Sequence, residues 1–187
     1  YKPIEKLTNK FTVANTYIKR IYNRSPNSGN KQQDNYYGER YSYLYQGNYN
    51  FNLDTSVVFG IEREDDQMGY NKDDTGRIDS KAYVTSQFFD YQSRITNNIY
   101  ATFGARVDEH SLAGGTGSNE DSHRATIAYV FDDKTTKLKS SYGTGYRFPS
   151  LFELKYVFLA SAETLPFVNA ENSKSYDFGI EKTVNPN

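Results

Sequence analysis

The stretch Arg63–Asp79 carries a dense group of carboxylates. Its six acidic residues are Glu64, Asp65, Asp66, Asp73, Asp74 and Asp79. Hard oxygen ligands of this kind hold calcium, and the two sides of a hairpin could bring such residues together. The candidate calcium ligands are Asp65, Asp66, Asp73 and Asp74. The spacing is not that of an EF-hand, and the glycines in the stretch suit turns, so a solvated acidic loop is the alternative.

Two histidines bracket the next polar stretch. His110 and His123 lie on either side of a glycine-rich segment, with Asp108 and Glu109 adjacent. A metal pair or an acid–base dyad would use such residues, but the i, i+4 helical spacing of zinc peptidases is absent. No serine or aspartate stands out as a nucleophile beside a base. The sequence therefore favours histidines at a loop edge and predicts no enzyme and no cofactor.

The segment Arg147–Asn172 offers the candidate ligand-binding residues. It opens with Tyr-Arg-Phe-Pro, and Pro149 suits the first turn of a short helix that runs through Tyr156. The candidates are a guanidinium that attracts anionic groups and aromatic rings that line a mouth: Arg147, Phe148, Phe152 and Tyr156. By strand parity Arg147 should point to the same side as Gly143 and Gly145. In the alternative, Phe148 and Leu151 pack the loop onto a rim and Arg147 pairs with a carboxylate such as Asp177.

Composition restricts the scaffold that positions these residues. The 187-residue chain has a net charge of −1, no cysteine, no tryptophan, 18 tyrosines and 12 phenylalanines. Missing cysteine excludes disulfides and thiolate chemistry, and the balanced charge gives no footprint for nucleic acid. Mean hydropathy is −0.82, and no window approaches the roughly 20 apolar residues of a spanning helix.

Period-two alternation of apolar and polar residues dominates the chain, and helical periodicity is nearly absent. In Asn98–Asp108, for example, Ile99, Ala101, Phe103, Ala105 and Val107 share one parity. The pattern predicts eight strands, at Phe11–Tyr22, Gly38–Phe51, Leu53–Glu62, Lys81–Tyr91, Asn98–Asp108, Arg124–Asp132, Lys137–Arg147 and Ser173–Thr183. We therefore expect an all-β fold.

The connections alternate strictly between short and long. The short ones are Asn50–Asp54, Gln92–Asn97 and Asp132–Thr136, and the long ones are Asn23–Asn35, Arg63–Ser80, Glu109–Ser122 and Phe148–Asn172. A transmembrane antiparallel up-and-down β-barrel has this arrangement, with short periplasmic turns, long external loops and strands that are apolar toward lipid. Only the lipid-facing half of each strand must be apolar, which reconciles a membrane barrel with a hydrophilic composition. Tyrosine suits the two membrane interfaces.

One run carries a more specific resemblance. Phe103-Gly-Ala-Arg-Val-Asp-Glu-His110, the strand Arg124–Phe131 and Leu138-Lys-Ser-Ser-Tyr-Gly-Thr-Gly-Tyr-Arg-Phe-Pro-Ser-Leu-Phe-Glu-Leu154 resemble the barrel of TonB-dependent outer-membrane receptors. The segment Ser173–Glu181 is similar to the strand that follows in this family. Leu165–Glu171 departs from the family's Asn-Pro-rich pattern. The segment that begins at Gly104 most resembles the cobalamin-transporter branch, although siderophore receptors share it.

The resemblance implies a partial barrel over residues 1–187, about eight strands of a 22-stranded barrel, with the plug domain, signal peptide and C-terminal strands outside this chain. It further implies location in the cell outer membrane, contact with outer-membrane lipid, and active uptake of cobalamin or a ferric siderophore. The TonB–ExbB–ExbD system would supply energy through the missing N-terminal part. A passive porin and a soluble secreted β-sandwich binding module are the alternatives.

Overall fold

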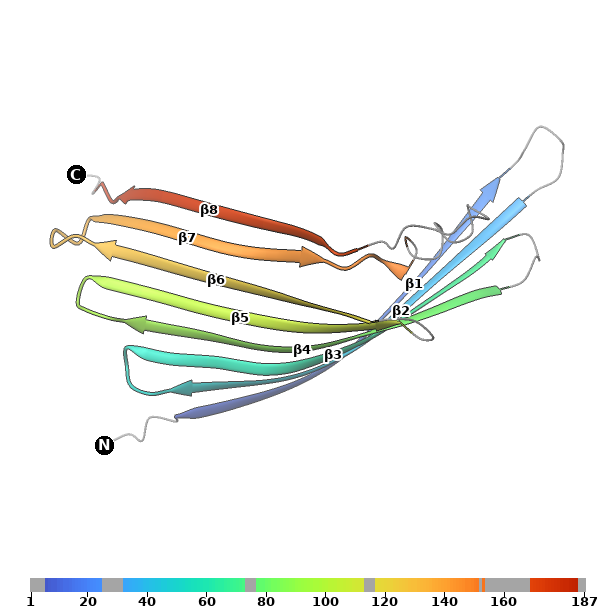
Figure 1. The fold of residues 1–187 in the computed structure, drawn as a ribbon, viewed down its shortest axis with the longest axis horizontal. Helices are drawn as coiled ribbons and strands as arrows, with labels where there is room; N and C mark the ends of the chain where they lie inside the picture. The colour runs from blue at the N-terminus through green and yellow to red at the C-terminus, as the bar shows by residue number, and fades with distance from the viewer. Residues whose placement is uncertain are drawn as a thin grey trace.

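The computed structural model describes residues 6–24, 32–72, 77–112, 117–151, 153 and 169–184. They form one antiparallel sheet in which every strand pairs with its sequence neighbour, in the order β1-β2-β3-β4-β5-β6-β7-β8 (Figure 1). The strands are β1 Leu7–Arg24, β2 Gln32–Asn50, β3 Thr55–Lys72, β4 Arg77–Arg94, β5 Ile99–Leu112, β6 Ser118–Val130, β7 Thr136–Arg147 and β8 Glu171–Lys182. The predicted eight strands and up-and-down order are confirmed. No helix among the described residues is long and apolar enough to cross a membrane.

The three short turns lie where the sequence predicts them, at one end of the sheet (Figure 1). Side chains of turn residues bond to the local backbone in each. Asp54 N–H donates to Asn52 Oδ1 at 2.8 Å, Ile99 N–H donates to Thr96 Oγ1 at 3.1 Å, and Thr135 N–H donates to Asp133 Oδ1 at 2.9 Å.

The long connections are shorter than predicted. The predicted loop Arg63–Ser80 is largely strand, because β3 continues to Lys72 and β4 begins at Arg77. The predicted loop Glu109–Ser122 likewise belongs mostly to β5 and β6. Near the long connections both faces of these strands carry polar residues. The alternation that reveals a strand therefore fades there, while backbone pairing persists. The sequence pattern detects only the part of each hairpin that is nearer the short turns.

Two adjacent rows across the sheet show how the faces differ. One row runs through all eight strands with apolar or aromatic residues: Leu7, Tyr49, Val57, Tyr91, Phe103, Ala125, Tyr142 and Tyr176. The neighbouring row is polar or small except at Val58: Thr8, Asn48, Val58, Asp90, Gly104, Arg124, Gly143 and Ser175. We call these sides the apolar face and the polar face.

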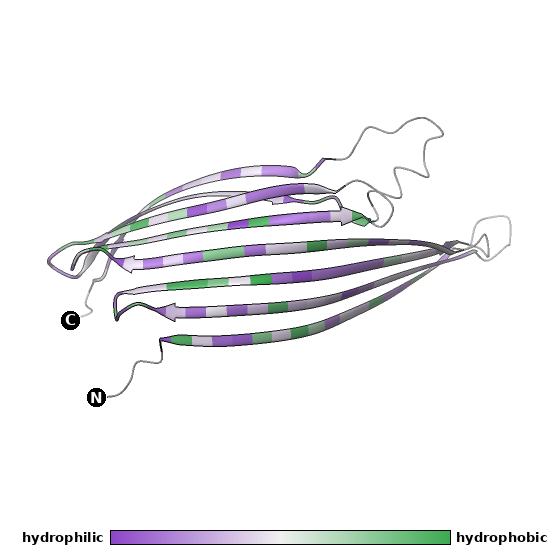
Figure 2. Cartoon of the chain, turned by 60° about the horizontal axis from the view of Figure 1, so that its bottom comes forward, coloured by the Kyte–Doolittle hydropathy of each residue, from purple (hydrophilic) through white to green (hydrophobic). Residues whose placement is uncertain are grey.

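The described residues place no second layer over the apolar face. Among the described residues Ala82 is the only buried hydrophobic residue, while Phe103 is 45% and Tyr129 is 39% exposed. Hydrophobic and hydrophilic residues alternate along the strands (Figure 2). A soluble sandwich would bury such rings between two sheets, so the soluble β-sandwich alternative is wrong.

The apolar face ends where charged residues appear on it. Arg63 Nε lies 2.6 Å from Asp65 Oδ1, and the Arg63 guanidinium lies 4.7 Å from the centre of the Tyr83 ring. The nine residues from Thr55 to Arg63 span roughly 30 Å at about 3.3 Å each. With strand tilt this matches the apolar band of about 25 Å in membrane barrels.

Candidate functional site: the polar face and the end of β7

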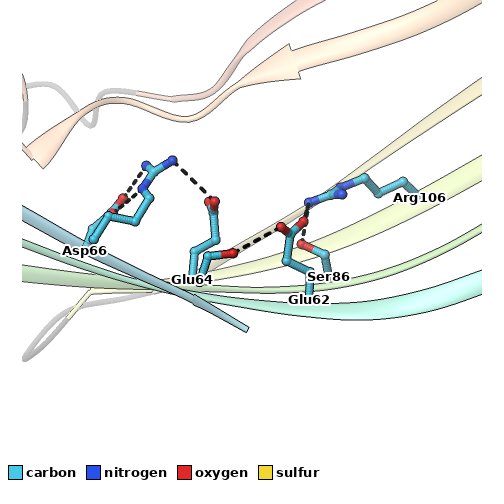
Figure 3. A network of polar contacts seen from close by, with 7 residues as sticks. Glu62, Glu64, Asp66, Ser86 and Arg106 are labelled. Carbon is cyan, nitrogen blue, oxygen red and sulfur yellow. Dashed lines mark hydrogen bonds and ion pairs between the residues drawn. The ribbon is translucent and has the colours of Figure 1, made fainter. Parts of the chain in front are cut away.

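The polar face carries a network of ion pairs across neighbouring strands. Arg40 of β2 donates two hydrogen bonds to Asp66 of β3, from Nε to Oδ1 at 2.6 Å and from Nη2 to Oδ2 at 2.7 Å. Its Nη1 lies 3.3 Å from Glu64 Oε1 (Figure 3). A guanidinium that engages one carboxylate through both oxygens fixes the geometry of the pair. Arg40 thus ties the upper parts of β2 and β3 together.

A second arginine, Arg106, links strands β3, β4 and β5 nearer the short turns. Arg106 of β5 donates to Glu62 of β3 at 3.1 Å, to Ser86 of β4 at 2.7 Å and to Asp108 on its own strand at 2.8 Å. The Asp108 side chain is 8% and the Glu62 side chain is 20% exposed. Burying carboxylates to this extent costs free energy unless a cation or hydrogen-bond donor compensates, and Arg106 is both.

The end of β7 reaches the same network. The Tyr146 hydroxyl donates to Asp108 Oδ2, and the Phe148 ring stacks on His110 with centroids 4.6 Å apart. Burial lowers the pKa of His110, which lies beyond the charged edge of the apolar face. The candidate site therefore combines the ion pairs of β2–β5 with a polar and aromatic contact from β7.

Arg147 is fully engaged by two carboxylates. Its Nε and Nη2 donate to Glu171 at 3.1 and 2.9 Å, and its Nη1 and Nη2 donate to Glu153 at 3.0 and 3.1 Å. The hydrogen bond from Arg147, helped by the backbone and hydroxyl of Ser150, lowers the pKa of Glu153 to about 2. We call Arg147, Glu153 and Glu171 the Arg147 clasp, because it joins both ends of the segment between β7 and β8.

This geometry corrects one expectation for Arg147 and agrees with another. It pairs with Glu153 and Glu171 rather than with Asp177. The β7–β8 ladder is unbroken from Gly143–Ser175 to Arg147–Glu171, so Arg147 keeps the parity of the two glycines, as the sequence predicts. Tyr146 has the opposite parity, but its hydroxyl reaches Asp108 where β7 no longer pairs with β6.

The start of the predicted helix is set by a capping box. Ser150 N–H and its hydroxyl both donate to Glu153 Oε2, at 2.7 and 2.8 Å, and Glu153 N–H donates to Ser150 Oγ at 3.2 Å. Such reciprocal bonds mark Ser150 as the N-cap. The sequence predicted Pro149 in the first helical turn. In the structure Pro149 instead precedes the N-cap residue Ser150.

The structure places the other predicted residues as follows. Phe148 lies against the polar face, whereas Phe152 and Tyr156 fall outside the described residues. Asp65 and Asp66 alternate between the two faces, where Arg63 and Arg40 engage them, so they do not converge. Asp73 and Asp74 lie outside the described residues, and the calcium site stays a prediction. Within the described part, no group of three or more acidic or histidine side chains could hold a metal ion.

The two histidines do not form a dyad. His110 lies on the polar face against Phe148, whereas His123 packs on Tyr142, with ring centroids 5.6 Å apart, on the opposite face. Sequence reasoning did not single out Arg40, Arg106 or Tyr146. The two arginines had a signal, because each stands at the polar parity of a strand whose other parity is largely apolar or aromatic, a pattern that marks a polar interior. Tyr146 had no such signal.

Comparison with known proteins is consistent with this arrangement. The family described as "TonB dependent receptor-like, beta-barrel" matches residues 5–187. The chain belongs to this family of TonB-dependent receptor barrels. It is a segment of an outer-membrane β-barrel, with its apolar face toward lipid and its polar face toward the lumen. The eight strands form an open sheet, not a closed barrel.

Two solved structures share the fold of this receptor segment. The first is titled "Copper transporter OprC"; the TM-score is 0.82 at 13% identity, over 98% of this chain and 34% of that chain. The second, the RagAB peptide transporter, has a TM-score of 0.61 at 17% identity, over 96% of this chain and 26% of that chain. The receptor segment therefore spans about a third or less of these proteins. No curated protein sequence matches it.

Proposed function

We propose that the complete receptor imports a scarce, bulky nutrient across the outer membrane with energy from the TonB–ExbB–ExbD system. The family match over residues 5–187 is the observation that carries this proposal. In this account the full protein closes the barrel with further strands and holds a plug domain in the lumen. Open sheet edges do not occur in lipid, which supports the presence of the further strands.

The ion pairs of the polar face support a lumen whose wall is ordered. Two arginines, Arg40 and Arg106, engage four carboxylates there: Glu62, Glu64, Asp66 and Asp108. Such pairs hold the wall rigid, so a passing cargo would meet a fixed pattern of charge. The proposed activity makes and breaks no bond in the cargo, and the receptor is a transporter, not an enzyme.

For the cargo we propose cobalamin first and a ferric siderophore second. The run that begins Gly104-Ala-Arg-Val-Asp-Glu-His110 supports this order through its resemblance to cobalamin transporters. The neighbours of known structure are a copper transporter and a peptide transporter by title, so this architecture also serves other cargo.

A growth experiment tests both levels. A strain that lacks the receptor gene is compared with the complemented strain on limiting cobalamin and on limiting iron, with and without TonB. Loss of growth on cobalamin alone supports the first cargo, and loss on iron alone supports the second. Normal growth in both media overturns the cargo proposal. Uptake that persists without TonB overturns active transport and favours a passive porin. Mass spectrometry of imported cargo should find it unchanged.

A further inference from the structure

Strands β6 and β7 separate at the end of the sheet that carries the long connections. The β5–β6 ladder continues to the pair His110–Ser118, and the β7–β8 ladder continues to Arg147–Glu171. The β6–β7 ladder ends earlier, at Arg124–Gly143. Residues 118–123 of β6 thus pair only with β5, and the end of β7 pairs only with β8. Figure 1 shows β7 diverging from β6 toward this end.

A side chain replaces the backbone where the ladder stops. His123 N–H donates to Thr144 Oγ1 at 2.9 Å, which takes the place of the next strand-to-strand bond. Gly143 and Gly145 flank Thr144. A Cβ on Gly143 would meet nothing closer than 3.6 Å, and glycine permits backbone angles that other residues avoid. Where the strands separate, this stretch of β7 therefore loses its backbone partner β6 and keeps only β8.

Among the described residues, side-chain contacts bridge the gap. The Tyr146 hydroxyl bonds to Asp108, and Phe148 stacks on His110, so the end of β7 is joined to β5 across the end of β6. These contacts are independent of the backbone ladder and can break without unfolding any strand. We call Asp108, His110, Tyr146 and Phe148 the β7 latch.

The Arg147 clasp determines what would move together. Arg147 of β7 bonds to Glu171 at the start of β8 and to Glu153, through both oxygens of each carboxylate. The end of β7, the start of β8 and Glu153 are therefore one mechanical unit. In the part of the chain that the structure describes, its attachments to β5 and β6 are the latch and the Thr144 bond.

We propose that this unit is a flap in the barrel wall, hinged at Gly143–Gly145 and held on the polar face by the β7 latch. When the latch is closed, Phe148 covers His110 on the lumenal side. When it opens, the flap tilts away from β6 and uncovers Asp108 and His110. The proposal concerns the wall itself and does not depend on which cargo the receptor carries.

The experiment measures a distance across the gap in the full-length receptor in outer-membrane vesicles. The chain has no cysteine, so spin labels attach specifically to cysteines introduced within it at Asp121 of β6 and at Asn172 of β8, which pairs with Tyr146 beyond the hinge; any cysteine elsewhere in the full receptor is replaced first. Both side chains are exposed. With wild-type latch residues, pulsed electron paramagnetic resonance should give one narrow distance distribution. Tyr146→Phe removes only the hydroxyl that bonds to Asp108 and should add a second, longer population.

Matched variants separate the latch from general damage. Tyr142→Phe alters a tyrosine of the same strand that packs on Tyr176, with ring centroids 5.0 Å apart, outside the latch, and should leave one distance. Gly143→Ala combined with Tyr146→Phe should reduce the longer population by stiffening the hinge. One unchanged narrow distance in both Tyr146→Phe and Tyr146→Phe/His110→Ala would overturn the proposal. If the double variant fails to assemble, the single hydroxyl deletion decides the question.

Discussion

The polar face is held together differently at strands β2–β5 and at strands β6–β7. From β2 to β5 the backbone ladders are continuous, and Arg40 and Arg106 cross-link the strands through short ion pairs. From β6 to β7 the ladder stops at Gly143, and a few side chains hold the end of β7. The same sheet therefore contains a rigid wall and a separable one. Ion pairs stabilise where strands are already paired, and the looser contacts lie beside the long connection.

The largest predicted effect comes from breaking the rigid side. Arg106→Met leaves Glu62 and Asp108 without a cation, and removing one partner of a fully buried pair costs about 3–5 kcal/mol. Because the Arg106 side chain is 35% exposed, we expect about 2–3 kcal/mol less stability toward urea in lipid vesicles. Arg124→Gln is the control: its pair with Asp90 involves a 65% exposed side chain and should cost less than about 1 kcal/mol. Equal losses for the two variants would contradict the account.

A pair of glycine substitutions compares packing on the two sides. A Cβ on Gly60 of β3 would collide with the Tyr45 carbonyl oxygen and lie 2.5 Å from the Phe88 ring, so Gly60→Ala should cost about 1–3 kcal/mol. Gly143→Ala has free space and should change stability by less than about 0.5 kcal/mol. Urea unfolding of the assembled receptor measures both. A tolerated Gly60→Ala would show that the β2–β4 region is not tightly packed.

A smaller and more local effect is expected for the Arg147 clasp. Its groups are exposed, and exposed ion pairs contribute little to global stability. Arg147→Gln should therefore leave urea unfolding nearly unchanged while the segment between β7 and β8 is cleaved faster by added protease. Arg147→Lys keeps the charge but loses the paired hydrogen bonds, and it should be intermediate. Unchanged cleavage in Arg147→Gln would mean that the clasp does not anchor this segment.

The smallest effect concerns pH. Burial lowers the pKa of His110, so the neutral ring is favoured in the folded receptor. The stacking on Phe148 should be fully present above the ordinary histidine pKa of about 6.5 and weaken as pH falls below it. Asp66 acts on His110 in the opposite sense, because its negative charge raises the pKa of the ring, but burial is the larger effect. Urea unfolding between pH 7.5 and 5 should show a decline that His110→Gln reduces. An identical decline in that variant would assign it to the carboxylates.

The sequence predicts most of the fold because one physical constraint acts on it directly. Lipid requires an apolar residue at every second position, and turns require residues such as Asn52 and Asp133 that bond to their own backbone. Above the band this constraint ends, so the pattern did not reveal that β3 extends to Lys72.

The site was harder to predict because it depends on register across strands. Arg40 and Asp66 are 26 positions apart in sequence and meet only through the β2–β3 pairing. The sequence predicted that Arg147, next to Phe148 and Pro149, binds anionic ligand groups. In the structure its guanidinium is paired with two carboxylates of the chain. The contact of Tyr146 with Asp108 could not be predicted from strand alternation, because it forms where β7 no longer pairs with β6.

The central claim is that the apolar face meets lipid and the polar face meets the lumen. Spin labels placed one at a time from Ile99 to Val107 along β5 of the full-length receptor in bilayers test it most directly. We predict that labels at Ile99, Ala101, Phe103, Ala105 and Val107 collide preferentially with oxygen, which partitions into lipid, and that labels at the intervening residues do not. Equal accessibility along the strand, or oxygen contact on the side of Arg106, would contradict the account.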